Sequence, residues 1–311
     1  MNTCISVPLI DYVRDWLKNG KYLEVRASTY DRMITSAAAL ERFSISQITV
    51  ETLTEDDFRN YVSALIDYGY SYATIKKQMR IVSVPIREAY EKGLLVRNPC
   101  VGVRTPSKSH IKHVAKEITA YTKEEQERVR AVLGTNRRIG YSAIELMLET
   151  GMRAGEILAL NWTDVFLERR RIRVHSTVVN LANKRIAYVQ EGAKSETSNR
   201  WVPLSPRAIQ ILTRLRDNAK YEWLFDNGGD RLSYEALRWQ CLRVCRDAEV
   251  EYRGLHIWRH TFATNQYYKG TDVKILSKLL GHADTTITYN LYIHLYGDGF
   301  EDMLSAVCDQ H

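Results

Sequence analysis

The chain has 311 residues and a net charge of +7, and 45% of its residues are hydrophobic. This length and apolar content allow one large domain or two ordinary domains. No stretch approaches the roughly 18 consecutive apolar residues of a membrane span, and the N-terminus lacks the charged start and apolar run of a signal peptide. The basic charge fits a polyanionic partner without identifying one.

The first hundred residues have the hydrophobic spacing of a small helical module. A first helix is expected around residues 9–17, and Ser28 is a candidate N-cap for a second. Thr54 and Asp57 fit a capping box at the start of a third helix.

A fourth helix is expected over residues 71–92, and its two faces differ in character. Its apolar face is formed by Ile75, Met79, Val82, Ile86 and Tyr90. Its other face carries Lys76, Lys77, Arg80 and Arg87. Because these cations have no acidic counterface, this side of the helix is a candidate surface for an anionic partner.

Residues 104–118 have the composition of a linker between two units. Gly93 can end the fourth helix in a left-handed conformation, and Pro99 prevents the helix from continuing. The segment that follows is basic, includes Lys108 and Lys112, contains a proline and lacks a clear periodicity. We therefore expect a helical domain over 1–103, a linker over 104–118 and a second domain over 119–311.

The second unit mixes helical and strand patterns. The expected helices cover 123–133, 138–149 and a segment that begins near Arg153. The expected strands lie within 162–179, at 185–190 and at 200–204, and the chain from Pro206 onward is expected to be helical to its end. These patterns predict a mainly α fold with a small β component.

Cysteine usage indicates a reducing compartment. The five cysteines, Cys4, Cys100, Cys241, Cys245 and Cys308, are odd in number and irregularly spaced, which argues against a disulfide framework. Cys241 and Cys245 lie one helical turn apart, and we expect packed thiols there because no Cys-x-x-Cys pair accompanies them. Carboxylates do not cluster at ligand spacing, so neither a metal nor another cofactor is expected.

Three segments of the second unit carry residues suited to phosphate chemistry. A glycine break before a new helix places Arg153 near a helix N-terminus, where anions are favoured, although a surface arginine paired with Glu156 would have the same spacing. His256 and Arg259 are three residues apart, so both could face one ligand. His282 follows a predicted helix end at Gly281. Cleavage of a phosphodiester without a metal needs such cations, a nucleophile and an acid.

These segments resemble the tyrosine recombinase (phage integrase) family. The resemblance rests on Thr-Gly-Met-Arg-Ala-Gly-Glu at 150–156, His-Ile-Trp-Arg-His at 256–260, Leu-Gly-His at 280–282 and Tyr-Ile-His at 292–294. It implies a helical core-binding domain followed by an α+β catalytic domain with a small antiparallel β-sheet. It also implies catalytic roles for Arg153, Lys194, His256, Arg259, His282 and Tyr292.

The resemblance implies a distinct role for the lysine and for the tyrosine. Lys194 lies in the segment that the family uses as a hairpin, where its lysine protonates the leaving 5′ oxygen. Tyr289 and Tyr296 are nearby, but Tyr292 alone is followed by x-His and lies ten residues after His282 (292 − 282 = 10). Tyr292 is therefore the expected nucleophile, and Glu156 is expected to be structural.

The resemblance also implies partners and a reaction. We expect a bacterial, cytoplasmic, DNA-associated enzyme that forms a 3′-phosphotyrosyl bond, acts as a homo-tetramer on synapsed duplex sites without metal or ATP, and works with an accessory directionality or DNA-bending protein. The reaction would integrate or excise a phage or another mobile element. Two alternatives remain: a type IB topoisomerase, and an inactive DNA-binding protein on the same fold.

DNA contacts are expected outside the catalytic set. The candidates are Lys76, Lys77, Arg80, Lys108 and Lys112. Phe300, Met303, Leu304 and Val307 have the spacing of one apolar face of a C-terminal helix. This helix could pack on its own domain, but the family resemblance implies that it packs against a neighbouring protomer, which is the arrangement we expect. Many integrases of this family carry a further N-terminal arm-binding domain, which we expect to be absent from this chain.

Overall fold

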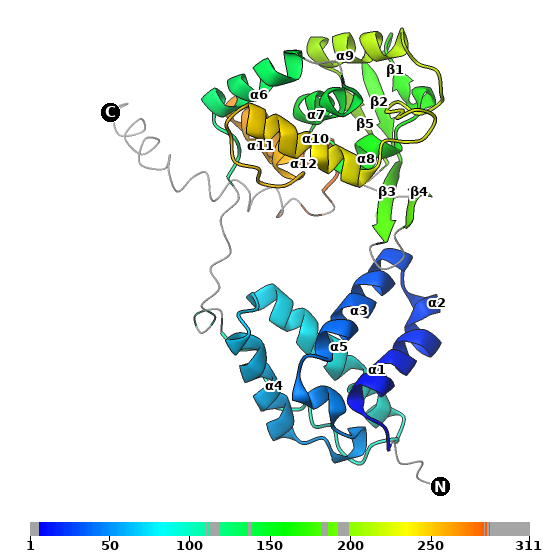
Figure 1. The fold of residues 1–311 in the computed structure, drawn as a ribbon, viewed down its shortest axis with the longest axis vertical. Helices are drawn as coiled ribbons and strands as arrows, with labels where there is room; N and C mark the ends of the chain where they lie inside the picture. Colours follow the sequence, from blue (N-terminus) through cyan, green and yellow to red (C-terminus); the bar gives the residue numbers. More distant parts are fainter. Residues whose placement is uncertain are drawn as a thin grey trace, which may run out of the picture. The chain divides into compact units, whose positions relative to one another are not determined.

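The computed structural model describes residues 6–107, 109, 111, 119–135, 138–181, 186–191, 199–282, 284 and 286. The chain divides into two compact units (Figure 1). The first comprises Met1–Glu117 with Leu181–Ile186, and the second comprises Ile118–Asn180 with Ala187–His311. None of the described helices is long and apolar enough to cross a membrane.

The described part of the first unit before residue 108 is mainly helical. Its elements are α1 (Leu9–Trp16), a π-helical turn (Leu17–Lys21), α2 (Tyr22–Glu24), α3 (Ala27–Leu40), two 3₁₀ turns (Ser44–Gln47 and Val50–Thr52), α4 (Glu55–Asp67) and α5 (Tyr72–Glu91). Its core is fully buried at Leu9, Leu17, Leu40, Leu65, Ile75 and Ile86. The amphipathic pattern therefore places each helix with its apolar side inward.

Local signals in this unit are confirmed at two helix ends. Thr54 and Asp57 form the expected capping box, in which the Asp57 backbone N–H donates to the Thr54 hydroxyl and the Thr54 backbone N–H donates to the carboxylate. Gly93 adopts the expected left-handed conformation after α5, with φ +71°.

Two details of the predicted helices are wrong. α3 begins at Ala27, with Arg26 as its N-cap, so Ser28 lies inside the first turn and does not cap it. The cause is that the backbone N–H groups of Thr29 and Tyr30 are already satisfied by the carbonyl of Arg26. Tyr90 is exposed, and Ala89 takes its place on the buried face of α5.

The second unit is built around helix α7, which lies among its other helices in Figure 1. The helices are α6 (Lys123–Thr135), α7 (Ile139–Thr150), α8 (Ala154–Ala159), α9 (Pro206–Arg216), α10 (Tyr234–Asp247), α11 (Ile257–Tyr268) and α12 (Val273–Leu280). α7 contacts α6, α8, α9, α10 and α11. Nearly all of its residues are buried, as expected for a helix that is surrounded by other helices.

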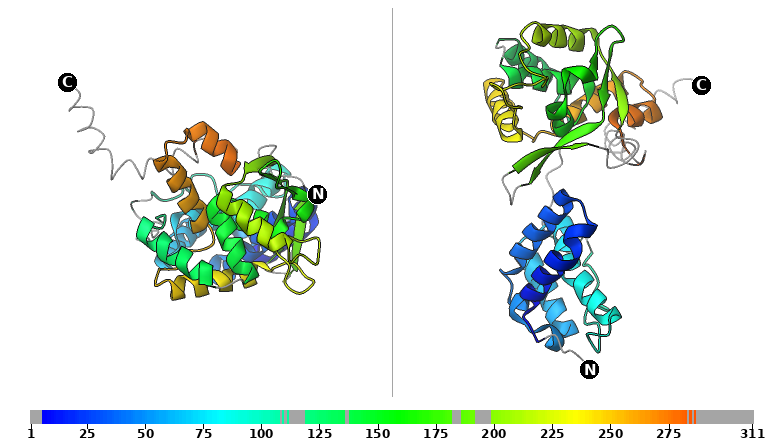
Figure 2. Two further views of the ribbon diagram at one scale, coloured as in Figure 1. Left: turned by 90° about the horizontal axis from the view of Figure 1, so that it is seen from above. Right: turned by 90° about the vertical axis from the view of Figure 1, so that its right-hand side faces the viewer.

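Two small sheets complete the second unit (Figure 2). The strands are β1 (Val165–Phe166), β2 (Arg171–Val174), β3 (Ser176–Leu181), β4 (Ile186–Glu191) and β5 (Arg200–Pro203). β1, β2 and β5 form an antiparallel sheet, and β3 pairs with β4. Ile172, Val174 and Val202 turn inward from the first sheet and join the core of α7 and α9. The mainly α fold with small antiparallel sheets is thereby confirmed.

Two further expectations for this unit have clear outcomes. Cys241 and Cys245 are free, buried thiols in the core, in contact with Trp258 and Tyr121 respectively, as expected for packed cysteines. The chain after Pro206 is not helical throughout, because residues 217–232 form turns and isolated bridges between α9 and α10. The C-terminal helix expected from Phe300 lies outside the described residues.

Candidate functional site

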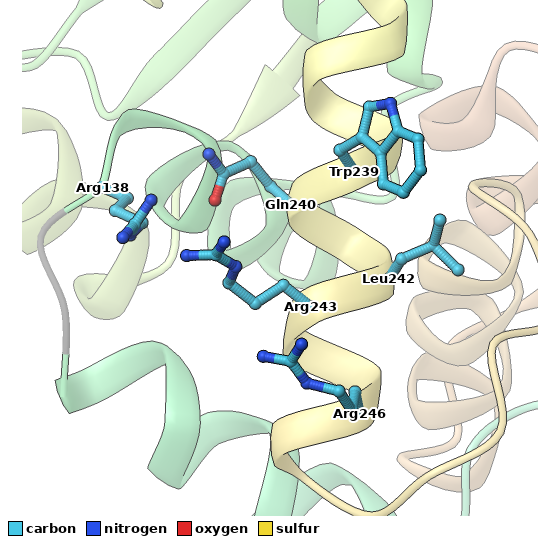
Figure 3. Close-up of a pocket in the computed structure, with 6 residues that line it drawn as sticks. All are labelled: Arg138, Trp239, Gln240, Leu242, Arg243 and Arg246. Carbon is cyan, nitrogen blue, oxygen red and sulfur yellow. The ribbon is translucent and has the colours of Figure 1, made fainter.

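Polar side chains gather at several places in the described part of the second unit, and two of these places are candidate sites. The first is a surface hollow of about 600 Å³, lined by Arg138, Trp239, Gln240, Leu242, Arg243 and Arg246, which lies mainly over α10 (Figure 3). Its lining includes neither a carboxylate nor a histidine, so it lacks an acid or base for catalysis. The second is a cluster of arginines at the junction of α8, α11, α12 and β5. This cluster includes a carboxylate and adjoins histidines, the groups that the hollow lacks.

Arg153 enters this cluster because the chain turns sharply between α7 and α8. Gly151 ends α7 in the left-handed conformation, with φ +65°. A Cβ at Gly151 would lie 2.3 Å from the ring of Phe262, so both the backbone angle and the close packing require glycine. Arg153 follows as the N-cap of α8, with its side chain 34% exposed.

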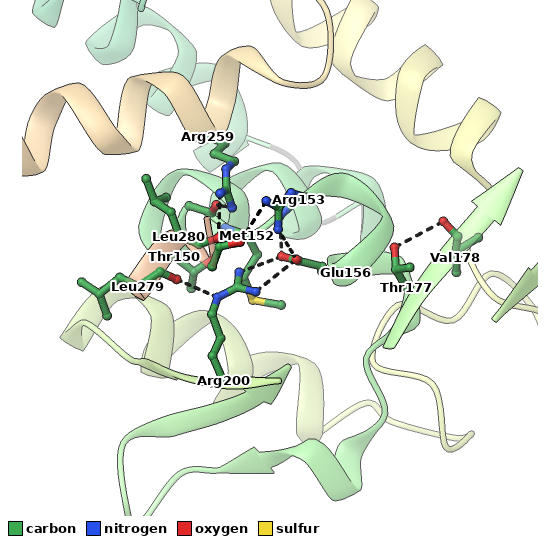
Figure 4. A network of polar contacts seen from close by, with 12 residues as sticks. Thr150, Met152, Arg153, Glu156, Thr177, Val178, Arg200, Arg259, Leu279 and Leu280 are labelled. Carbon is green, nitrogen blue, oxygen red and sulfur yellow. Dashed lines mark hydrogen bonds and ion pairs between the residues drawn. The ribbon is translucent and has the colours of Figure 1, made fainter. Parts of the chain in front are cut away.

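Glu156 is the carboxylate at the centre of the cluster. Its side chain is 5% exposed, and it accepts hydrogen bonds from Arg153 Nη1 at 2.8 Å and from the Arg153 backbone N–H at 2.9 Å. Arg200 donates to both carboxylate oxygens, at 3.1 and 2.8 Å (Figure 4). Burial raises the pKa of Glu156, but the hydrogen bonds and charges of these two arginines outweigh burial and lower it to about 2.

The carboxyl end of α12 is the second anchor of the cluster. Arg200 Nε donates to the carbonyl of Leu279 at 2.7 Å, and Arg259 Nη2 to that of Leu280 at 2.6 Å. Arg153 Nη2 donates to the carbonyl of Gly281 at 3.2 Å. Three successive carbonyls at a helix end therefore bind three arginines, and cations are favoured there by the helix dipole.

Arg259 is held from the opposite side as well. Its Nη1 donates to the carbonyl of Gly151 at 2.9 Å, and the residue is 7% exposed. Burial, together with the charges of Arg153 and Arg200, lowers the pKa of Arg259 to about 9. The contacts of Gly151, Leu280 and Gly281 thus bring together two arginines that are 106 residues apart in the sequence (259 − 153 = 106).

Two histidines adjoin the arginines. His256 lies at the start of α11, and His282 follows Gly281, which ends α12 in the expected left-handed conformation. Burial and the charges of Arg259 and Arg153 lower the pKa of both, to about 4 for His282. Both imidazoles are therefore neutral at pH 7 in the unliganded protein, and a bound anion would raise their pKa.

The charges in this cluster favour an anionic ligand. Three arginines face one carboxylate, Glu156, which leaves a formal surplus of two positive charges. Planar guanidinium groups bind phosphate oxygens with paired hydrogen bonds and never lose their charge at neutral pH. The described residues contain no group of three or more potential ligands that could hold a metal ion.

Some residues of the expected set cannot be placed. Lys194, Tyr292, Lys108 and Lys112 lie outside the described residues. The strands that flank Lys194 do not pair with each other, since β4 pairs with β3 and β5 pairs with β2. The expected hairpin is therefore wrong in its pairing.

Arg200 is the residue that sequence reasoning missed. The sequence predicts a strand over residues 200–204 but assigns the first of them no role in the site. The available signal was weak. Arg200 occupies an inward position of β5, where the alternation of buried and exposed residues along a strand favours an apolar side chain. This charged residue is nevertheless buried there, with 9% of its surface exposed. A buried arginine requires a buried acid, and Glu156 is distant in sequence (200 − 156 = 44).

Comparison with known proteins identifies the family. Residues 112–298 match the model of the phage integrase family, and residues 8–105 match the phage integrase SAM-like domain. The chain is 24% identical over 325 residues to the ICEBs1 integrase of Bacillus subtilis, which covers 99% of this chain and 82% of that protein. It is 27% identical over 264 residues to a XerC-like tyrosine recombinase of Caldanaerobacter subterraneus subsp. tengcongensis, covering 76% of this chain and 66% of that protein.

Solved structures share the whole fold. The Tn1549 transposon integrase in complex with a circular intermediate DNA matches with a TM-score of 0.79 and 19% identity, over 97% of this chain and 100% of that one. A lambda integrase tetramer bound to a Holliday junction matches with a TM-score of 0.69 and 18% identity, over 92% of this chain and 77% of that one. The two domain models together span most of this chain, and the chain therefore belongs to the phage integrase family of tyrosine recombinases.

Proposed function

We propose that this chain is a site-specific recombinase that integrates or excises a mobile element, with Tyr292 as its nucleophile. The observation that carries the proposal is the convergence of Arg153 and Arg259 on the end of α12, beside His256 and His282. Two fixed guanidinium groups there can bind the non-bridging oxygens of one phosphate and stabilise the charge that develops during cleavage.

The proposed reaction conserves the bond energy of the DNA. The hydroxyl oxygen of Tyr292 attacks phosphorus and forms a 3′-phosphotyrosyl ester, while the bond to the 5′ oxygen breaks. His256, whose pKa is lowered so that its imidazole is neutral at pH 7, accepts the tyrosine proton. Lys194 gives a proton to the leaving 5′ oxygen. A second 5′ hydroxyl then reverses the attack, so neither ATP nor a metal is consumed.

The proposed partner is duplex DNA that carries a recombination site, held by four copies of the chain. Support comes from two relatives of the fold: the Tn1549 integrase was solved with transposon circular-intermediate DNA, and lambda integrase as a tetramer on a Holliday junction. An accessory directionality or DNA-bending protein is part of the same proposal, on the strength of the family resemblance alone.

A suicide half-site substrate tests the nucleophile. Tyr292→Phe should abolish the covalent protein–DNA adduct and leave DNA binding intact, because only the attacking hydroxyl is removed. Tyr289→Phe is the matched control and should still form the adduct. Absence of the adduct in Tyr289→Phe, with retention in Tyr292→Phe, would show that the nucleophile is assigned to the wrong tyrosine.

A type IB topoisomerase, the alternative function, would act on a different substrate from a recombinase. A recombinase exchanges strands between two recognition sites, whereas a topoisomerase relaxes a supercoiled circle without a second site. A synapsis assay on two labelled sites distinguishes them. Relaxation with no exchanged product would overturn the recombinase proposal.

A further inference from the structure

Arg200 takes part in the arginine cluster but is directed at the protein rather than at a ligand. Its side chain is 7% exposed, against 34% for Arg153. Both of its Nη atoms contact Glu156, and its Nε contacts the carbonyl of Leu279. A guanidinium used in this way has little capacity left for a phosphate, and its role must lie in what it holds.

We propose that Arg200 is a positioning residue for DNA cleavage, which fixes Glu156 under Arg153 and fixes the carboxyl end of α12 ahead of His282. The proposal rests on the proposed function of the site. It extends the catalytic set of Arg153, Lys194, His256, Arg259, His282 and Tyr292 by one buried residue from β5 that does not touch the DNA.

The first link runs through Glu156 to Arg153. The carboxylate is buried, and its contacts with Arg200 leave only part of its charge to attract Arg153. Without Arg200, Arg153 would be the remaining close cation for a buried anion and would be drawn further toward it. Arg200 therefore keeps Arg153 available for a phosphate.

The second link runs through the end of α12 to His282. Arg200 binds the carbonyl of Leu279, while Arg259 and Arg153 bind the two carbonyls that follow it. The next residue along the chain is His282, so the three bonds define where its backbone emerges. Arg200 is the member of this group that ties α12 to the sheet, because it begins β5.

The same strand start connects Arg200 with the general acid. Lys194 precedes Arg200 by six residues (200 − 194 = 6). The contacts of Arg200 with Glu156 and with the carbonyl of Leu279 therefore fix the start of β5. One side chain thus contacts the start of β5, the carboxylate that binds Arg153 and the helix end that precedes His282.

A second buried carboxylate in the same unit provides a control for stability. Glu145 on α7 is 4% exposed and pairs with Arg207 at 2.7 Å and Arg214 at 3.2 Å, both from α9. It repeats the chemistry of one buried acid with two arginines, and none of these three residues belongs to the arginine cluster. Changes here are expected to destabilise the unit without altering the arginine cluster.

The test measures the rate constant of cleavage separately from the fraction of protein molecules that is active. Covalent adduct on a suicide half-site is followed in single turnover at saturating DNA, alongside half-site affinity and thermal stability, for Arg200→Lys and the control Arg214→Lys. Lysine retains the charge but cannot bind both carboxylate oxygens and Leu279 together. Arg200→Lys should lower the cleavage rate constant by roughly 10²-fold, the scale of a small displacement of catalytic groups, with unchanged affinity.

The control should behave differently. Arg214→Lys should lower the melting temperature yet cleave with the wild-type rate constant. A wild-type rate constant in Arg200→Lys, or a defect confined to the amplitude of the reaction, would overturn the positioning role. If Arg200→Lys does not fold, Glu156→Gln and its control Glu145→Gln are compared by the same criteria, with the slower cleavage expected only in the first.

Failure of the underlying function gives a separate result. If the wild-type chain forms no adduct, the cleavage proposal itself is wrong and the positioning role fails with it. If Tyr292→Phe still forms adduct, only the assignment of the nucleophile is wrong. If the wild type forms adduct through Tyr292 while Arg200→Lys matches its rate constant, only the positioning role is overturned.

Discussion

Glu156 shows how one residue can serve both stability and chemistry. Its carboxylate is buried between Arg153 and Arg200, and truncating one partner of a buried ion pair typically costs about 3–5 kcal/mol because the other charge is left uncompensated. The same carboxylate orients Arg153 and offsets part of the local positive charge. We propose that a DNA phosphate neutralises the remaining positive charge.

The lowered pKa of His282 predicts how the free energy of unfolding depends on pH. Its pKa is lowered from 6.5 to about 4, so the unfolded chain binds more protons than the folded chain between these values. The contribution of His282 to the free energy of unfolding should therefore be fully present above pH 6.5 and fall as the pH drops toward 4. Solvent screening at this partly exposed site reduces the size of the contribution.

Urea denaturation at neutral and acidic pH checks this prediction. The His282→Gln variant should lose less stability on acidification than the wild type does. His256 and His260 also have lowered pKa values, so part of the acid sensitivity should persist in the variant. An equal decrease in variant and wild type would show that His282 is not a source of the effect.

At the scale of elements, the turn between α7 and α8 positions both arginines that we propose to bind phosphate. Gly151→Ala should destabilise the second unit by about 1–3 kcal/mol through its left-handed backbone, with a further cost from the contact with Phe262. It should also slow cleavage, because the Gly151 carbonyl binds Arg259.

Gly270→Ala is the control for backbone strain. Gly270 has φ +79°, and a Cβ added to it would meet no atom within 4 Å, so alanine introduces strain there without a clash. Gly270→Ala should lower the denaturation midpoint less than Gly151→Ala does. Its single-turnover cleavage rate should equal that of the wild type. Equal effects in the two variants would show that packing against Phe262 does not contribute to the effect of Gly151→Ala.

Helix α5 carries the charged surface predicted to contact DNA. Lys76, Lys77 and Arg80 are exposed and have no carboxylate partner among the described residues. Replacing all three with glutamine should weaken DNA binding and reduce the slope of log K against log salt by about 0.9 for each phosphate that is no longer bound.

Arg59 on α4 offers the matched control. It is exposed in the same unit but already pairs with Glu55 at 2.6 Å and Asp56 at 3.0 Å. Arg59→Gln should leave the salt slope as it is in the wild type. A triple variant of α5 with the wild-type slope would exclude this face from DNA binding.

At the scale of the whole molecule, the remaining prediction concerns assembly. Two glycines precede the apolar spacing of Phe300, Met303, Leu304 and Val307, which lie outside the described residues. Deletion from Phe300 onward should leave one protomer able to bind a half-site but impair cooperative filling of the full site and strand exchange. Gel-shift titration and recombination assays measure the two effects. Full-rate recombination by the truncated chain would exclude the segment from assembly.

The sequence by itself determined the family, the fold class and most helix ends. The capping box of Thr54 and Asp57 and the left-handed stops at Gly93 and Gly281 were predictable because each depends on neighbours within a few residues. Hydrophobic spacing predicted α5 for the same reason. It erred at Tyr90, because one turn of a helix leaves two adjacent positions that can face the core.

Only the tertiary structure decided how distant segments meet. The sequence contained Arg153 and Arg259 but not the carbonyls of Gly151, Leu280 and Gly281 that hold them together. It contained β4 and β5 but not their placement in different sheets, because strand pairing is set by contacts across the fold. Arg200 carries the clearest lesson: its role depends on Glu156, and a buried ion pair between α8 and β5 exists only once the chain has folded.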